Sequence, residues 1–241
     1  MAEVTTTRVA PPGVVDCHGL TVREINVAIK RLLADGASSI RVVGPAGRHS
    51  LAVALRTDAR IEFEGPVGWY AAGMNCGAHV VIRGNCGWGL AECMMSGSVE
   101  VHGLAGSGTA ASIRGGEVFV EGDAGARAGI AMKGGTLVVG GSVGYMSGFM
   151  MQRGTVIACG DAAEGLGDSM YEGTIYVGGA VEAFGADAVE KEVTDQDREM
   201  LFGALGPFGI DAAAFDFTKV ESGRRLWNFS TKEPELWRTA L

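Results

Sequence analysis

The chain has 241 residues and a net charge of −8. This length suits one elongated domain with an appendage at each end, and the acidic balance argues against a nucleic-acid partner, because phosphate binding requires a basic face. No apolar run approaches the length of a membrane span, and the first residues do not resemble a signal peptide. We therefore expect a soluble, cytoplasmic protein with no membrane partner.

The first segment, 1–60, predicts a small α/β cap. Residues 14–16 and 40–43 are short apolar runs typical of strands. Between them, Thr21 and Glu24 have the spacing of a capping box, and apolar residues follow at helical spacing as far as Gly36. Segment 48–57 is ambiguous between strand and helix. We expect this cap to cover the open first turn of the repeat that follows.

The second segment, 61–185, repeats with a period of 19 residues. The repeat is marked by a glycine ladder without insertions, at Gly65, Gly84, Gly103, Gly122, Gly141, Gly160 and Gly179. Two apolar ladders keep the same period, one of Val80, Val99, Val118, Leu137, Val156 and Ile175, the other of Met94, Ile113, Met132, Met151 and Met170. A repeat this short and strict indicates a coil of constant pitch, in which each turn stacks on the last.

Each repeat contains a short β-branched run bounded by glycines, which predicts strands at 80–82, 98–101, 117–120, 136–139, 155–158 and 174–177. Strands stacked roughly 4.8 Å apart align equivalent side chains, so we expect both apolar ladders to fill the interior. Helical repeats are excluded because 29 of the 39 glycines lie in 65–179, where they would weaken any helix. The predicted fold class is mainly β, a single-stranded parallel β-helix of about six to seven 19-residue coils, with the α/β cap before it and a helical or irregular tail after it.

The third segment, 186–241, is the tail. Residues 194–205 predict one capped helix, and no regular element is predicted for the remainder. Beyond 209 this polar setting includes the aromatic residues Phe215, Phe217, Trp227, Phe229 and Trp237. Such a tail either folds back on the coil or docks on another subunit, and we predict that Trp227, Phe229 and Trp237 anchor the chain to a partner.

Several residue types invite a chemical interpretation. Asp123 and Asp161 share one position of the repeat two turns apart, so their carboxylates would lie roughly 9–10 Å apart, near the upper separation of an inverting glycosidase pair. Both follow a corner glycine, where aspartate commonly bonds its own turn, and this structural role is favoured. Arg114 and Lys133 share a position in adjacent turns, which indicates either a solvated corner or a surface for an acidic partner.

The other reactive side chains favour no site. The histidines His18, His49, His79 and His102 lie in different segments without a metal-binding spacing. The five cysteines form no CxxC pair, so we expect free thiols in a reducing compartment. The glycine-rich loops match no phosphate-binding motif. The sequence therefore predicts no catalytic, cofactor-binding or metal-binding residue. It does predict an interface, formed by Arg114, Lys133, Trp227, Phe229 and Trp237.

The repeat also carries a family likeness. The runs GPVGWYAAG, GWGLAECMMSG, GDAGARAGIAMKGG and GYMSGFMMQRG resemble the GXGXG β-helix at the C-terminus of the glutamate synthase large chain. The resemblance covers about 60–240 and includes the motifs at 48–51 and 224–229. Size and the short α/β cap are similar to the free-standing form, found as the small subunit of N-methylglutamate synthase and in GlxC-like proteins.

This resemblance implies a non-catalytic structural subunit of a hetero-oligomeric enzyme. Its partners would be an amidotransferase-like subunit and a synthase subunit that holds FMN and iron–sulfur clusters. The enzyme would convert methylamine and L-glutamate to N-methyl-L-glutamate and ammonia, or use ammonia as the amine. Ala2 stands where an amidotransferase nucleophile would be cysteine, and no cysteines are grouped for a cluster.

Two alternatives stay open. The same β-helix occurs in the C subunit of formylmethanofuran dehydrogenase and of a formyltransferase/hydrolase complex. A stand-alone polysaccharide-active β-helix protein is the third possibility.

Overall fold

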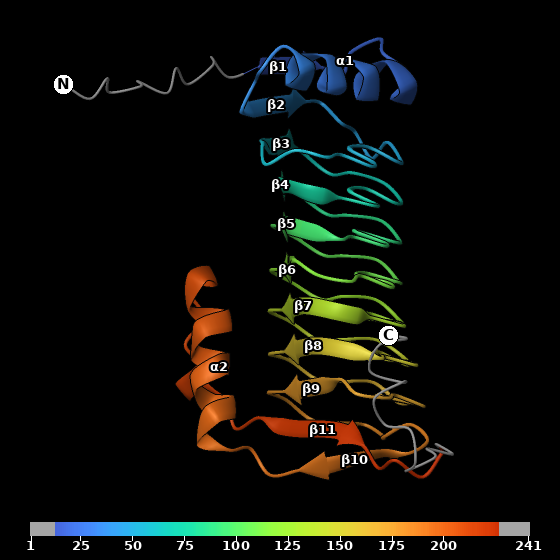
Figure 1. The fold of residues 1–241 in the computed structure, drawn as a ribbon, viewed down its shortest axis with the longest axis vertical. Coiled ribbons are helices and arrows are strands. Elements are labelled where there is room, and N and C mark those ends of the chain that lie inside the picture. Colours follow the sequence, from blue (N-terminus) through green and yellow to red (C-terminus); the bar gives the residue numbers. More distant parts are fainter. Residues whose placement is uncertain (1–12, 227–241) are drawn as a thin grey trace, which may run out of the picture.

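The computed structural model describes residues 13–226, which form one 11-stranded sheet wound into a parallel β-helix (Figure 1). The predicted fold class is thus confirmed. The strands are β1 (Gly13–Asp16), β2 (Ser39–Val43), β3 (Arg60–Glu64), β4 (Cys76–Ile82), β5 (Ser96–Val101), β6 (Glu117–Val120), β7 (Lys133–Val139), β8 (Arg153–Ala158), β9 (Thr174–Val177), β10 (Ala188–Lys191) and β11 (Thr218–Ser222). The helices are α1 (Val22–Ala34) and α2 (Asp195–Leu205), followed by two short 3₁₀ turns at Gly206–Phe208 and Ala212–Ala214.

Stacking follows the sequence period. From β3 to β9 each strand pairs in parallel with the next, and the partners in the strand cores are 19 residues apart, as in the pair of Val118 and Leu137. All six predicted strand segments lie within β4 to β9. Because every turn repeats the same register, equivalent residues lie above one another along the whole coil.

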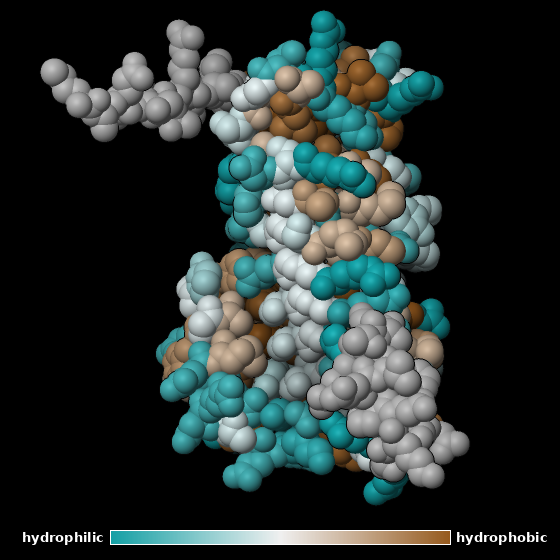
Figure 2. All heavy atoms as spheres, in the orientation of Figure 1, coloured by the Kyte–Doolittle hydropathy of each residue, from teal (hydrophilic) through white to brown (hydrophobic). Residues whose placement is uncertain are grey.

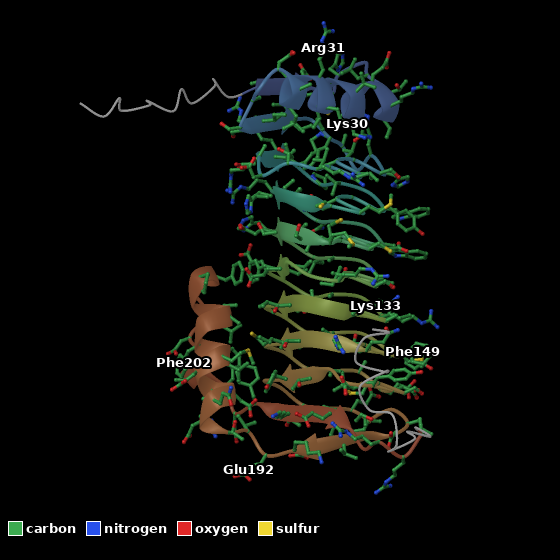
Figure 3. The ribbon with its side chains drawn as sticks, viewed as in Figure 1. Lys30, Arg31, Lys133, Phe149, Glu192 and Phe202 are labelled. Carbon is green, nitrogen blue, oxygen red and sulfur yellow. The ribbon has the colours of Figure 1, made fainter. Side chains whose placement is uncertain are left out.

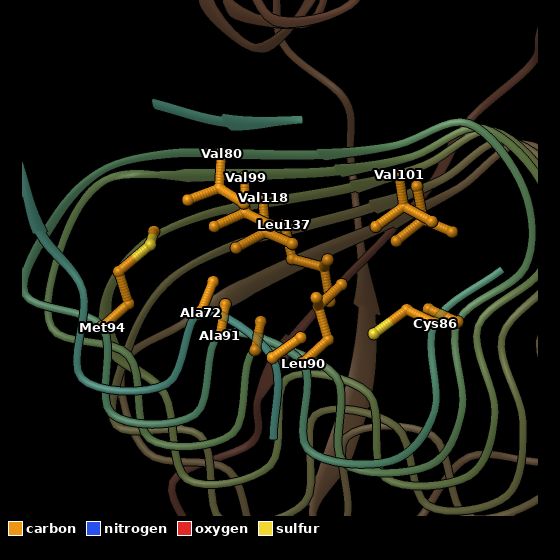
Figure 4. Packing of buried hydrophobic residues seen from close by; sticks show 14 of the residues in the cluster. Ala72, Val80, Cys86, Leu90, Ala91, Met94, Val99, Val101, Val118 and Leu137 are labelled. Carbon is orange, nitrogen blue, oxygen red and sulfur yellow. The ribbon is translucent and has the colours of Figure 1, made fainter. Parts of the chain in front are cut away.

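Both predicted ladders fill the interior. Every member of the Val/Leu/Ile ladder and of the Met/Ile ladder is fully buried. Figure 4 shows Val80, Val99, Val118 and Leu137 in one file, with Met94 and Leu90 pointing into the same space. Burying a side chain of this size stabilises the fold by about 1.5–3 kcal/mol, so the ladders dominate the stability of the coil.

The N-terminal segment continues the same sheet. Strand β1 pairs in parallel with β2, and β2 pairs in parallel with β3. Helix α1 begins with the predicted capping box, in which Thr21 and Glu24 bond each other's backbone N–H groups. Its buried residues Ile25 and Ile29 join the interior cluster, and the helix lies beside β1 and β2 at one end of the coil (Figure 1).

Segment 48–57 is neither strand nor helix. The backbone N–H of Ser50 donates to the carbonyl of Trp69, and that of Ala54 donates to Gly73. The segment is therefore an arc that stacks on the arc one turn later. Its ambiguity in the sequence has a simple cause, because Ser50, Ala52 and Ala54 adopt left-handed φ values that neither regular element uses.

The tail folds back on the coil within the described residues. Strand β11 pairs antiparallel with β9 and with β10, so two strands extend the sheet beyond the last coil strand and β10 forms its edge. Helix α2 lies along the outer face of β6 to β9, where Leu201 and Leu205 pack against Val138, Ile157 and Tyr176 in a second core (Figure 1). The predicted helix is confirmed, and two strands that the sequence did not indicate accompany it.

A polar network fixes the start of α2. Tyr176 donates from its hydroxyl to Oδ1 of Asp197 at 2.6 Å, and Lys219 Nζ lies 3.0 Å from Oδ2. Asp197 also forms the capping box of α2 with Thr194. Burial opposes ionisation, yet hydrogen bonds from Tyr176, Thr194 and Lys219 hold the pKa of Asp197 well below its usual range.

Candidate docking surface

One side of the coil is built from six stacked arcs, which we call the turn face. The arcs are residues 69–76, 88–95, 107–114, 126–133, 145–152 and 164–171, and each leads into the next strand from β4 to β9. Backbone hydrogen bonds join successive arcs, as from Tyr70 N–H to the carbonyl of Trp88 and from Arg127 N–H to that of Tyr145. Equivalent side chains therefore form columns across this face.

The second, fourth and sixth residues of every arc have left-handed φ values. In the first arc these are Tyr70, Ala72 and Met74, at φ values of 58°, 55° and 54°. Such values are uncommon for residues other than glycine and cost about 1–2 kcal/mol each. The inter-arc hydrogen bonds offset this cost. Sequence reasoning missed the pattern, although glycine at the equivalent positions Gly89 and Gly108 was a usable signal.

Aromatic rings are stacked on the turn face. The rings of His49 and Trp69 lie 4.6 Å apart at 13°, and those of Trp69 and Trp88 lie 5.5 Å apart at 15°. His49 Nδ1 accepts a hydrogen bond from the backbone N–H of Trp69. Each ring thus covers a flat face of its neighbour.

The two tryptophans of this stack and three further exposed side chains of the first two arcs form what we call the upper apolar band. It is made of Trp69, Tyr70, Met74, Trp88 and Met95. Trp88 is 58% exposed and Met74 54%. Figure 2 shows apolar atoms at the surface at the level of β4 and β5, with hydrophilic atoms below them at the level of β6. Large, contiguous exposed apolar side chains mark a protein contact surface.

The predicted interface residues Arg114 and Lys133 lie next to this band. They occupy the last position of their arcs and so share a column with Met95. Arg127 lies on the same face, one position after Ala126 at the start of its arc. Among residues 13–226 no ion pair joins any of these three cations to a carboxylate. We call Arg114, Arg127 and Lys133 the basic band.

The other interface residues predicted from the sequence, Trp227, Phe229 and Trp237, lie outside the described residues. Two other tail aromatics named from the sequence, Phe215 and Phe217, are described, and they pack in the second core beneath α2. The sequence therefore did not identify the upper apolar band. The tryptophans at Trp69 and Trp88, 19 residues apart, were the available signal.

The aspartates Asp123 and Asp161 have structural roles. Oδ1 of Asp123 accepts a hydrogen bond from the backbone N–H of Ser142 at 2.7 Å, and Oδ1 of Asp161 accepts one from Ala180 at 2.8 Å. Each carboxylate therefore bonds the next coil, whereas the sequence suggested a bond within its own turn. These hydrogen bonds agree with the structural role that the sequence favoured for both residues.

A second surface feature lies between the first 3₁₀ turn after α2 and the outer sheet face. A groove of about 490 Å³ is lined on the sheet side by Glu100, His102 and Glu121 and on the other side by Pro207 and Phe208. His102 Nδ1 lies 3.2 Å from Glu121, and Nε2 lies 3.9 Å from Glu100. Nδ1 is thus within hydrogen-bonding distance of Glu121, whereas the distance from Nε2 to Glu100 is that of a longer ion-pair contact.

The cysteines are free thiols, as expected, and three of them are buried. Burial raises the pKa of Cys86 to about 12 and that of Cys159 to about 11, and it also raises the pKa of Cys17. A thiol held protonated is a poor nucleophile. These three residues belong to the packing of the two cores.

Two further observations apply to residues 13–226. No three or more His, Cys, Asp and Glu side chains gather there as metal ligands. Neither helix in this range has the length and apolar character required to cross a bilayer. Comparison with known proteins found no matching family model and no match among curated proteins.

Proposed function

We propose that the chain is a non-catalytic docking subunit of a hetero-oligomeric, glutamate synthase-like enzyme. The enzyme proposed is N-methylglutamate synthase, which converts methylamine and L-glutamate to N-methyl-L-glutamate and ammonia. In this arrangement the β-helix packs between an amidotransferase-like subunit and a synthase subunit that carries FMN and iron–sulfur clusters.

The upper apolar band carries the docking part of this proposal. Its five large side chains are exposed in the single chain, although every arc that bears them is rigidly bonded to its neighbours. A rigid surface loses little conformational entropy on binding, which favours association. Aromatic and methionine side chains are also the types enriched at the centres of protein interfaces.

The packed interior of the coil supports the same interpretation. Ladders of buried side chains fill this interior along its length, so binding is confined to the outer faces. The choice of a glutamate synthase-like complex depends on the resemblance of the glycine-rich arcs to the GXGXG β-helix, which extends over about 60–240.

The experiment is to purify the tagged chain from its native host and to assay the assembly. With glutamate and methylamine as substrates, we expect N-methylglutamate and ammonia, and flavin absorbance in the assembly but not in the isolated chain. Activity with 2-oxoglutarate and glutamine instead would assign an ordinary glutamate synthase. A chain that purifies without partner subunits would refute the proposal.

A matched pair of variants locates the contact. Trp88→Ser removes an aromatic side chain from the upper apolar band, whereas Phe202→Ser removes one from the exposed side of α2, across the molecule (Figure 3). We expect Trp88→Ser to weaken co-purification of the partners and Phe202→Ser to leave it unchanged. The reverse result would move the docking surface to α2.

A further inference from the structure

The turn face changes character along the coil axis. Beyond the upper apolar band come the two arcs 107–114 and 126–133, which hold the basic band. The next arc, 145–152, is apolar again, with Tyr145 46% and Met150 39% exposed. We call Tyr145 and Met150 the lower apolar band. Figure 3 shows Lys133 and Phe149 on this same side of the molecule.

The positive charge of the basic band is not balanced on its own face. Arcs 107–114, 126–133 and 145–152 contain three cations and no Asp or Glu, within a chain whose net charge is −8. The carboxylates of the flanking arcs, Glu92 and Glu164, form no ion pair with these cations, and Glu172, just after the last arc, pairs with Arg153 instead. Arg114 and Lys133 also stack in one column, so each repels the other. An anionic partner removes this repulsion.

The spacing of the two apolar bands suits a helix. The arc of Trp88 and the arc of Tyr145 are three coil steps apart, or about 14 Å at the usual strand spacing. An α-helix with its side chains is about 10–12 Å across. The columns between the bands carry short side chains, including Ser107, Ser112, Ala126 and Ala131, so a helix can approach the backbone closely there.

We propose that the turn face binds an acidic, amphipathic helix presented by a partner subunit. The helix lies across the coil, over arcs 107–114 and 126–133. Its carboxylates meet Arg114, Arg127 and Lys133, and its apolar side chains contact the upper and lower apolar bands. This inference rests on the proposed docking function and adds the chemistry and orientation of the partner element.

Carbodiimide cross-linking of the purified assembly tests the contact directly, because the reagent joins a lysine amine to a carboxylate without a spacer. We expect Lys133 to be linked, by mass spectrometry, to Glu or Asp residues of one helix of a partner subunit. Lys133→Arg keeps the charge but cannot be coupled, so the assembly should persist while this cross-link disappears.

Charge reversal measures how much the basic band contributes to partner binding. Arg114→Glu combined with Lys133→Glu should weaken partner binding about tenfold or more, with a smaller loss at high salt. The matched control, Arg23→Glu with Lys30→Glu, makes the same change of charge on α1 at the end of the coil and should leave binding unchanged (Figure 3).

The outcomes separate the two proposals. An assembly that forms without any cross-link between Lys133 and a partner carboxylate refutes the acidic helix and leaves the docking function standing. If the control pair weakens partner binding equally, the acidic helix is refuted as well, because the loss of binding would then follow the net charge of the chain. If no partner subunit co-purifies, the docking function itself fails.

Discussion

At the scale of single residues, close backbone approach explains the strict repeat. Gly106 shows the reason, since a Cβ built on it would lie 2.5 Å from Cδ1 of Trp88 and 2.8 Å from the carbonyl carbon of Gly87. Glycine at this position therefore lets the backbone approach Trp88 and the preceding arc at the strand spacing. The Trp88 side chain and Gly106 are thus two parts of one packing arrangement.

Gly106→Ala should destabilise the chain by about 1–3 kcal/mol, because the backbone of the preceding arc must shift to admit the methyl group. Gly203→Ala is the control, since no atom lies within 4 Å of a Cβ at that position in α2. That change should stabilise the chain by about 0.5–1 kcal/mol. Urea denaturation measures both, and equal effects would contradict the steric explanation.

Met132→Asp should lower the melting temperature by about 6 °C or more, since it buries a carboxyl group without a partner between two packed turns. Met132→Leu conserves volume and polarity and should cost less than about 1.5 kcal/mol. Calorimetry compares the two. An unchanged melting curve for Met132→Asp would mean that the interior admits water at this position.

At the scale of elements, α2 covers only part of the outer sheet face. The outward residues of β6 to β9 are apolar, namely Phe119, Val138, Ile157 and Tyr176, and they form the second core with the helix. The outward residues of β3 and β5 include charged side chains, namely Arg60, Glu62 and Glu100. The boundary between covered and open sheet therefore follows the polarity of the strands.

Asp197→Asn should loosen α2 at neutral pH by about 1–3 kcal/mol, because it weakens the charge-assisted hydrogen bonds to Lys219 and Tyr176. Protease digestion of α2 and chemical denaturation measure this effect. Glu199→Gln, on the exposed part of the same helix, should change stability by less than about 0.5 kcal/mol.

The pH dependence of the same contact has a defined sign. The pKa of Asp197 is lowered in the folded chain, so its stabilisation is complete above the pKa of an unfolded aspartate, about 3.9. It is lost as the pH falls below that value towards the folded pKa. The difference between the native chain and Asp197→Asn should therefore narrow below about pH 4. A constant difference down to pH 2 would contradict this assignment.

At the scale of the whole molecule, added elements cover both ends of the coil. The N-terminal end has α1 beside β1 and β2, and the C-terminal end has β11 and β10 antiparallel to the last coil strand. Unpaired edges of a parallel coil would otherwise template aggregation.

Two truncations separate the roles of the tail. Removing 224–241 keeps the coil, α2 and β11, so the chain should stay folded without aggregating, and we expect it to lose partner binding. Removing 186–241 exposes Phe119, Ile157 and Tyr176 together with the open edge of β9, so this chain should aggregate. Light scattering and circular dichroism distinguish the two. If the chain that lacks only 224–241 unfolds, these residues belong to the end cap of the coil.

The sequence by itself determined the coil, its period, the two interior ladders and both helix caps. These features depend on residues close together in the chain or repeated at a fixed interval, so spacing alone reveals them. The pairing of Val118 with Leu137 follows from spacing in this way, because a constant period leaves only one register.

The tertiary structure decided what lies outside the ladders. It gave Tyr70 and Met74 left-handed φ values, which these residue types disfavour and which the hydrogen bonds between arcs stabilise. It directed the carboxylate of Asp123 to the next coil and folded α2 onto β6 to β9, a contact between segments with no common period. It also placed Arg114, Lys133 and the upper apolar band on one face, because only the three-dimensional stacking of arcs shows which side chains remain exposed together.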